Sequence, residues 1–579
     1  MLRRNHYTII VCFIAVSILM LNALEAKACT ALMAGKKATA DGSVLMAWSN
    51  DGNRMSWIEI NPSMKFEPGT KVPMLSNRPI AARTLKVYHE QLQRGYDHVG
   101  YLNVPEDIPE VTYHHFIGRA RHMGRSSVGF NEHGVTIATE YTPMKDVLFN
   151  KNGAFAAGTN HWTTSMAQIA LMQSKTAREA IEVMGSLAEK HGFLYYFDEK
   201  VGLSLPIVGK DEAWIMEIFP AGPDWTPGSD APGAVWAARR IPDDEFFVHA
   251  NRSRIEEIDL DDKENFMASP NVHSLAEKLG LWNPAEKFVW WQVYGQPGGT
   301  WNCLREWIAY KTIAPSLKFS ATGDAKKDRY PFSVKPDKPI KVQDLVDLMR
   351  NQFEGTKWDL TEDPAFQVKG KKSPLARMQG PKELFELVSE LAGYKVFPER
   401  TITTDTTTQW LVVHNRKWLA EPVSSAIWFS LGPTYTSALA PLYPVVTELP
   451  LSWTSKTDFA RINRDQAAWN FNLVYNLVHV KEQEAIEDVK SVIKPAEERL
   501  FAVQEEFEKK VTDIYKTKGK DAAVEMLTQY SYFWFNQVHN TYNELVDFLL
   551  YKYVFENPEL APPKLPQIVP PYSATLSKN

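Results

Sequence analysis

The junction between Ala28 and Cys29 constrains most strongly what this chain can become. Before it lie two arginines within the first four residues and an apolar run over residues 9–21. A basic start, a short apolar run and small residues at Ala26 and Ala28 are typical of a secretory signal peptide with an A-x-A cleavage site. The run is shorter than the ~20 apolar residues of a membrane span. We therefore expect residues 1–28 to be a signal peptide and the mature chain to begin with Cys29.

A mature chain that begins with Cys29 would carry its own catalytic base. The thiolate of a cysteine is the nucleophile, and a neighbouring base must accept the thiol proton. A free α-amine has a pKa of roughly 7.7–8.0 and can do this near neutral pH. Two other interpretations stay open, namely a small buried residue at the start of a strand and a lipid-modified cysteine. Lipidation usually accompanies a leucine-like residue three positions earlier, where Ala26 stands, so the sequence favours a nucleophile.

Composition narrows the classes of protein. The chain has 579 residues, 44% of them hydrophobic, which is enough for the core of one or two domains. The net charge is -5 and the acidic and basic residues are interspersed. A nucleic-acid-binding surface is instead clustered and basic, so we expect no nucleic-acid partner. The sequence has no H-E-x-x-H, paired C-x-x-C, EF-hand or P-loop pattern, and we expect no metal and no organic cofactor.

The number and positions of the cysteines also favour Cys29 as a nucleophile. Of the three cysteines, Cys12 lies in the expected signal peptide, which leaves Cys29 and Cys303. Two cysteines are not a disulfide framework in a chain of this size. A bridge between them would consume the candidate nucleophile, and the sequence favours two free thiols.

The pattern of apolar residues predicts an α+β fold. Period-two and continuous apolar runs predict strands over residues 125–139, 212–218, 234–238, 245–250 and 408–414. Helical periodicity predicts helices over residues 161–190, 342–352 and 381–391. Strands and helices alternate irregularly, which favours antiparallel-rich layers over a doubly wound parallel sheet.

The character of the chain changes from about residue 465. Apolar residues recur every three or four positions with charges between them, which predicts an amphipathic helix with a kink at Pro495. A second helix follows Asp521, and the two are expected to pack on the main domain. We predict three parts: a signal peptide over residues 1–28, a catalytic domain over residues 29–455, and a helical extension with a Pro-rich tail over residues 456–579.

The segment that follows the junction has the pattern of a hairpin. Two apolar strands over residues 29–51 flank a Lys-rich turn that contains Asp41-Gly42. A simple two-residue turn would place Cys29 opposite Arg54, with Asp51 three positions away on the other face. A longer turn or a bulge is needed to bring Asp51 beside Cys29.

The opening Cys29-Thr30, followed by the segment KKATADGS at residues 36–43, resembles the start of the secreted cysteine dipeptidases. This family belongs to the N-terminal-nucleophile hydrolases and is related to penicillin V acylase and bile salt hydrolase. The similarity continues in order through blocks at residues 131–135, 175–180, 211–214, 249–255, 330–336 and 441–443. The resemblance implies a four-layer α/β/β/α sandwich followed by a C-terminal helical extension.

The resemblance also implies roles for single residues. Cys29 matches the nucleophile, Asp51 an aspartate that orients the terminal amine, and Asn251 an asparagine that donates to the oxyanion. Tyr141 falls where relatives carry a possible second donor. Trp48 stands where relatives often place an arginine, which would lower the thiol pKa and stabilise anions. Either another arginine takes this role or catalysis is altered or lost.

The junction and the resemblance together predict an exported dipeptidase, periplasmic or extracellular, that acts through Cys29 on a dipeptide or another small amide. Two alternatives stay open. One is an N-acyl amide hydrolase similar to penicillin V acylase or bile salt hydrolase. The other is a catalytically inactive, lipid-anchored binding protein, because Trp48 replaces an arginine and a cysteine follows a signal peptide.

Overall fold

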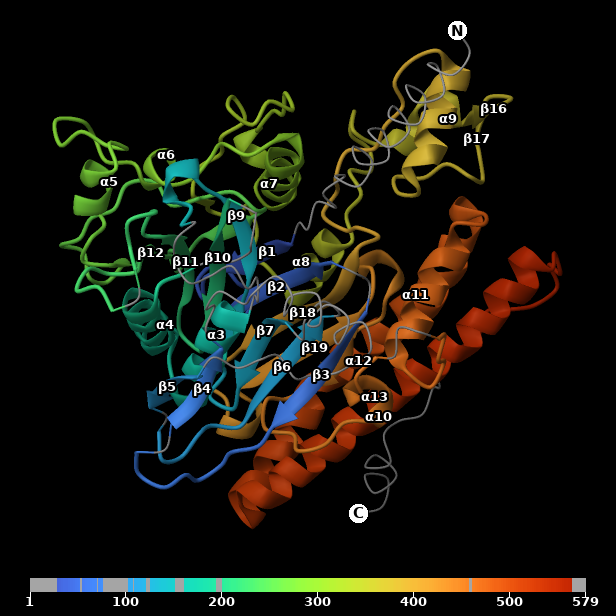
Figure 1. Ribbon diagram of the computed structural model, residues 1–579. Coiled ribbons are helices and arrows are strands. Elements are labelled where there is room, and N and C mark those ends of the chain that lie inside the picture. Colours follow the sequence, from blue (N-terminus) through green and yellow to red (C-terminus); the bar gives the residue numbers. More distant parts are fainter. Residues whose placement is uncertain are drawn as a thin grey trace, which may run out of the picture.

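Two large antiparallel sheets with helices on both sides form the protein, which is α+β as predicted (Figure 1). The computed structural model describes residues 29–52, 55–69, 71–75, 103–107, 109–120, 125–150, 161–193, 200–226, 228–457 and 461–564. The predicted signal peptide lies outside these residues. Within them, no helix combines the length and the apolar character that crossing a bilayer requires.

The first sheet has seven strands, and Cys29 directly precedes one of its interior strands, β1. In spatial order the strands are β15 (Ser333–Val334), β13 (Phe246–His249), β1 (Thr30–Ala34), β2 (Val44–Asp51), β18 (Thr407–Asn415), β19 (Ser425–Leu431) and β20 (Ala440–Leu442). All neighbouring pairs are antiparallel.

The second sheet has nine strands. Its main path runs through β14 (Phe266–Ala268), β12 (Ala234–Arg240), β11 (Ala213–Pro220), β10 (Val201–Val208), β8 (Thr136–Ala138), β7 (Arg125–Asn131), β6 (His115–Ala120) and β3 (Ser56–Asn61). The short strand β9 (Glu140–Pro143) pairs with β10 beside β8. Two small hairpins lie apart from the sheets, formed by β4 (Lys71–Leu75) with β5 (Asn103–Asp107) and by β16 (Gln367–Val368) with β17 (Lys371–Lys372).

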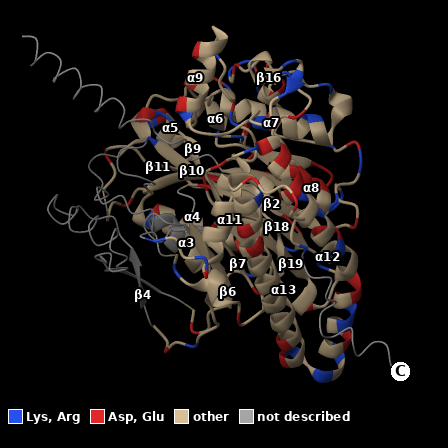
Figure 2. Ribbon diagram, turned by 90° about the vertical axis from the view of Figure 1, so that its right-hand side faces the viewer, with Lys and Arg blue, Asp and Glu red and all other residues tan. Residues whose placement is uncertain are grey.

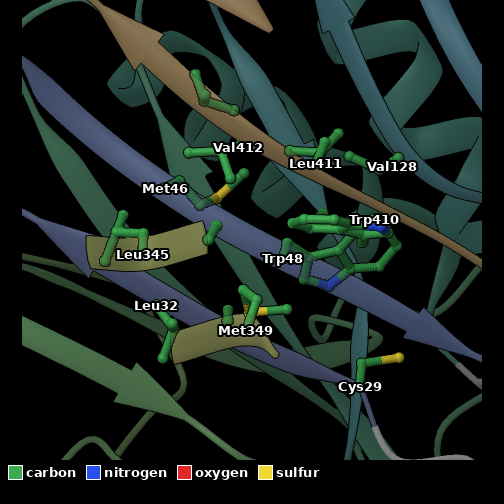
Figure 3. Packing of buried hydrophobic residues seen from close by; sticks show 14 of the residues in the cluster. Cys29, Leu32, Met46, Trp48, Val128, Leu345, Met349, Trp410, Leu411 and Val412 are labelled. Carbon is green, nitrogen blue, oxygen red and sulfur yellow. The ribbon is translucent and has the colours of Figure 1, made fainter. Parts of the chain in front are cut away.

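The two sheets face each other across an apolar core. Because alternate side chains of a strand point to opposite faces, the register puts Met46 and Trp48 of β2 on the same face as Leu411 of β18. Figure 3 shows this cluster, with Leu411 beside Val128 of the second sheet and Cys29 near Trp48. The start of β1 therefore lies at the boundary between the two sheets.

Helices cover the outer faces of both sheets. On the nine-stranded sheet, α3 (His161–Gln173) and α4 (Ala177–His191) bury a separate apolar cluster. On the seven-stranded sheet, α8 (Val342–Met349) packs on β2 and β18 (Figure 3). The other α-helices of the described residues are α5 (Ser274–Lys278), α6 (Trp290–Val293), α7 (Thr300–Ile313), α9 (Lys382–Ala392), α10 (Leu451–Thr454), α11 (Ala467–Val478), α12 (Glu482–Lys518) and α13 (Lys520–Leu549).

Two predicted elements are each divided in the structure. The helix predicted over residues 161–190 is α3 followed by α4, because Thr176 accepts a hydrogen bond from the Glu179 backbone N–H and starts a new helix. The strand predicted over residues 125–139 is β7 followed by β8. Gly134 lies in the turn between them with a φ of 81°, a conformation that glycine adopts without strain.

The C-terminal helices pack on the rest of the protein. Trp453 and Phe535 contact each other and the sheet residue Phe429. The buried Arg416, directly after β18, pairs with Glu508 of α12. The helix α12 continues through Pro495, and acidic and basic residues are interspersed along α12 and α13 (Figure 2).

Candidate active site

The register of β1 with β2 places a polar side chain beside the Cys29 thiol. Thr30 lies opposite Ser49, so the same register puts Cys29 opposite Asn50. The side-chain amide of Asn50 donates to Cys29 Sγ at 3.6 Å. The strands are joined by residues 35–43, which is the longer connection that the sequence required.

Distant segments hold this connection in place. The backbone N–H groups of Gly35 and Lys37 donate to the carbonyls of Glu245 and Asp243 at 3.1 and 2.7 Å. A Cβ atom on Gly35 would lie 2.4 Å from the Pro242 carbonyl oxygen, so only glycine fits here. The register that brings Asn50 to Cys29 therefore depends on residues about 200 positions away.

Cys29 is only 5% exposed, and its thiol is protonated. Burial raises the pKa of this thiol, and the negative charges of Asp51 and Glu140 raise it further. Hydrogen bonds from the Asp51 backbone N–H and from the Asn50 amide act in the opposite direction. Because the thiolate is the reactive form, a thiol with a raised pKa is a weak nucleophile.

Asp51 contacts the Cys29 thiol with its backbone N–H and not with its side chain. Its side chain belongs to the other face of β2, where Thr407 Oγ1 donates to Oδ1 at 2.8 Å and Arg400 forms an ion pair with Oδ2. Burial raises the pKa of this carboxyl, and the charge of Arg400 opposes the effect. Both carboxylate oxygens of Asp51 are thus engaged.

Asn251 lies on the other side of Cys29. Ala31 is opposite His249 of β13, so the same register brings Asn251 level with Cys29. Asn251 has a φ of 58°, in the left-handed region that asparagine tolerates better than most residues. Its Nδ2 donates to the Tyr141 carbonyl at 3.1 Å, and its Oδ1 accepts from Arg305 at 3.1 Å. These two bonds fix the direction of the amide.

Tyr141 reaches the site mainly through its backbone. It lies on β9, and its carbonyl accepts the bond from Asn251. Its ring packs 6.4 Å from that of Trp301 and borders the apolar cluster under α3 and α4. The structure thus brings together three of the residues named from the sequence, Cys29, Asp51 and Asn251, with the Tyr141 carbonyl beside them.

Arg305 of α7 is the residue that sequence reasoning missed. Its Nη1 donates to the Cys29 carbonyl at 2.6 Å and to Thr30 Oγ1 at 2.8 Å, while its Nη2 donates to the Ala250 carbonyl at 3.0 Å. Burial lowers its pKa to about 10, with a further decrease from Arg400, so it remains a cation at neutral pH. One guanidinium therefore connects Cys29 to the segment that carries Asn251.

Trp48 is a core residue on the same face as Cys29. It is fully buried, and within the described part of the chain its indole N–H has no partner (Figure 3). The arginine that contacts Cys29 is Arg305 of α7, and it binds the Cys29 carbonyl oxygen. The sequence does contain a hint, because Arg305-Glu306 interrupts an apolar helical run that is buried on nearly all sides.

The two cysteines outside residues 1–28 are free, as the sequence favoured. Cys303 is buried in α7, where its thiol contacts the Thr300 carbonyl at 3.3 Å and Asp328 at 3.8 Å. Burial raises its pKa to about 12, which leaves this thiol protonated. Neither thiol is therefore consumed by a disulfide, and Cys303 is packed inside a helix.

Known proteins with the same sequence pattern are peptidases. The profile of Peptidase family C69 matches residues 28–495, so the chain belongs to this family of cysteine peptidases of the N-terminal-nucleophile type. The chain is 26% identical to "Probable dipeptidase" of Salmonella dublin over 60% of its length and 71% of that protein. It is 23% identical to "Probable dipeptidase B" of Streptococcus pyogenes serotype M1 over 86% and 87% of the two chains. It is 23% identical to "Dipeptidase A" of Lactobacillus helveticus over 74% and 78%.

Proposed function

We propose that this peptidase is an exported dipeptidase whose nucleophile is Cys29, exposed as the first residue by cleavage after Ala28. The observation that carries the proposal is the position of Cys29, at the start of an interior strand, between Asn50 and Asn251 and with its carbonyl bound to Arg305. The names of the relatives support a dipeptide as substrate. The two facing sheets with outer helices are, in this proposal, the α/β/β/α sandwich of N-terminal-nucleophile hydrolases.

Cleavage would convert an unreactive thiol into a nucleophile. In the uncleaved chain, burial and two carboxylates raise the pKa of the Cys29 thiol. Cleavage frees the α-amine, which as an ammonium stabilises the thiolate and as an amine accepts the thiol proton. Asp51, held by Arg400 and Thr407, supplies the negative charge that favours the ammonium form.

The same residues account for the later steps. The Cys29 sulfur attacks the peptide carbonyl, and the second N–H of Asn251 Nδ2 stabilises the oxyanion. The ammonium of Cys29 then donates its proton to the leaving amine as the thioester forms. Water hydrolyses the thioester and releases the acid, again through an oxyanion.

The test combines N-terminal sequencing with kinetics. We expect the secreted protein to begin at Cys29 with an unmodified mass, and Cys29→Ala to abolish cleavage of a panel of dipeptides. Cys303→Ala is the matched control, because it removes the other thiol outside residues 1–28, and it should keep kcat/KM within a few-fold. Full activity of Cys29→Ala, a different first residue or an acylated Cys29 would refute the proposal.

A further inference from the structure

A second buried carboxylate, that of Glu140, lies close to the nucleophile. Glu140 is on β9 of the nine-stranded sheet, and its side chain is fully buried. Its Oε2 lies 2.5 Å from Nδ1 of His249, the residue opposite Ala31 of β1. Its negative charge acts on both Cys29 and Arg305. The pair of Glu140 and His249 therefore spans the two sheets beside the reactive sulfur.

One oxygen of this carboxylate is unused. Across the described residues, Glu140 Oε1 has no hydrogen-bond partner, and the same holds for His249 Nε2. Leaving a buried polar atom unpaired is unfavourable, so a ligand that brings a matching donor is stabilised there. Asp51, the other carboxylate acting on Cys29, has both oxygens engaged by Arg400 and Thr407. Glu140 is thus the carboxylate at this site that can accept a new donor.

We propose that Glu140, oriented by His249, accepts the α-ammonium group of the substrate through Oε1. This inference rests on the proposed dipeptidase function and specifies how the substrate is recognised. In a dipeptide only one carbon atom separates the ammonium nitrogen from the carbonyl carbon that is attacked. The acceptor must therefore lie beside the nucleophile, and a buried carboxylate binds an ammonium more strongly than an exposed one does.

The burial of the site is consistent with this role. Cys29 is itself only 5% exposed, so a substrate that reaches the sulfur also comes within range of the Glu140 charge. An N-acyl amide has no ammonium and would leave Oε1 unpaired. A site with an unpaired buried acceptor rejects a ligand that lacks the matching donor. Glu140 would therefore select dipeptides over N-acylated amides.

The test compares a dipeptide that the mature wild type cleaves with its desamino analogue, in which hydrogen replaces the ammonium. We expect the wild type to favour the dipeptide by about 10- to 100-fold in kcat/KM. Glu140→Gln should reduce kcat/KM at least tenfold more for the dipeptide than for the analogue, mainly through KM. Equal reductions for both substrates, or no difference from the wild type, would overturn the inference.

A matched control is Glu217→Gln. Glu217, on β11 of the same sheet, is also fully buried, but its oxygens accept from Ser253, Trp290 and the backbone of Arg254. This variant should affect the dipeptide and the analogue equally.

If Glu140→Gln does not fold, Glu140→Asp keeps the charge but moves it back by one methylene group, and it should reduce the preference for the dipeptide.

Two results with the wild type keep the two proposals separate. A wild type that cleaves the dipeptide and the analogue equally well disproves only the role of Glu140. A wild type that cleaves no dipeptide disproves the proposed function itself.

Discussion

The strained backbone of Asn251 is stabilised by contacts from two other segments, α7 and β9. A residue in the left-handed region costs of order 1–3 kcal/mol, which the surroundings must offset. Arg305 binds its Oδ1, the Tyr141 carbonyl binds its Nδ2, and Asn302 donates to its carbonyl at 2.9 Å. The direction of the proposed oxyanion donor is therefore set by residues that are distant from it in sequence.

Replacing Arg305 with methionine should impair catalysis. The variant loses the bonds to the Cys29 carbonyl and to Asn251 Oδ1, so the proposed nucleophile and the proposed oxyanion donor both lose their fixed positions. We expect kcat/KM on a dipeptide to fall by about 100-fold or more, as when an oxyanion contact is removed. The control is Lys311→Met, an exposed position on the same helix, which should stay within about twofold. Equal activity of the two variants would exclude the role of Arg305.

At the scale of single elements, α7 organises the buried charges around the site. Its Arg305 reaches Cys29, and the adjacent Glu306 pairs with Arg252 and Arg254, which follow Asn251 in sequence. Burial acts to raise the pKa of Glu306, but the two arginines prevail and lower it to about 2. The helix thereby holds the segment that follows β13 through a fully ionised triad.

Neutralising Glu306 should destabilise the protein strongly. Glu306→Gln leaves two buried guanidinium groups without a counter-charge, and breaking such a buried pair typically costs about 3–5 kcal/mol. Urea unfolding should show this loss as a lower midpoint, while Glu277→Gln, an exposed glutamate of α5, should change it by less than about 0.5 kcal/mol. A similar midpoint for the two variants would show that the triad contributes little.

At the scale of the whole molecule, sheets and helices share large buried surfaces that also contain titratable groups. His115 of β6 is buried, donates through Nδ1 to the Tyr113 carbonyl at 2.9 Å and accepts from Gln168 at 3.4 Å. Burial lowers its pKa from 6.5 to about 4, and His114 and Arg119 contribute to this decrease. The folded protein therefore holds this histidine neutral.

His115 should make stability depend on pH between about 6.5 and 4. In this window the unfolded chain binds a proton that the folded chain does not, so stability falls as the pH decreases. The full effect is about 3 kcal/mol, and it is complete below the folded pKa of about 4. Urea midpoints measured across this range should decline less steeply for His115→Gln than for the wild type. If the urea midpoints of the two proteins decline equally with pH, His115 is not the group responsible.

The sequence predicted much of the fold and part of the site. The spacing of apolar residues predicted strands such as β18 and helices such as α8. Side chains repeat every two residues in a strand and every 3.6 in a helix, and both periods can be read from a short stretch of sequence. The resemblance identified Cys29, Asp51 and Asn251. Arg305 could not be placed, because it bonds to a residue 276 positions away. The register of β1 and β2 could not be predicted from the sequence either, since it depends on contacts of residues 35–43 with distant loops.

Strand β1 has neighbours on both of its edges, β2 and β13. Such a strand cannot shift without breaking two ladders of backbone bonds, so main-chain pairing holds Cys29 in place together with the Arg305 side chain. Protein engineers could therefore exchange peripheral segments to change which compounds are accepted, while the chemistry at the end of β1 is preserved.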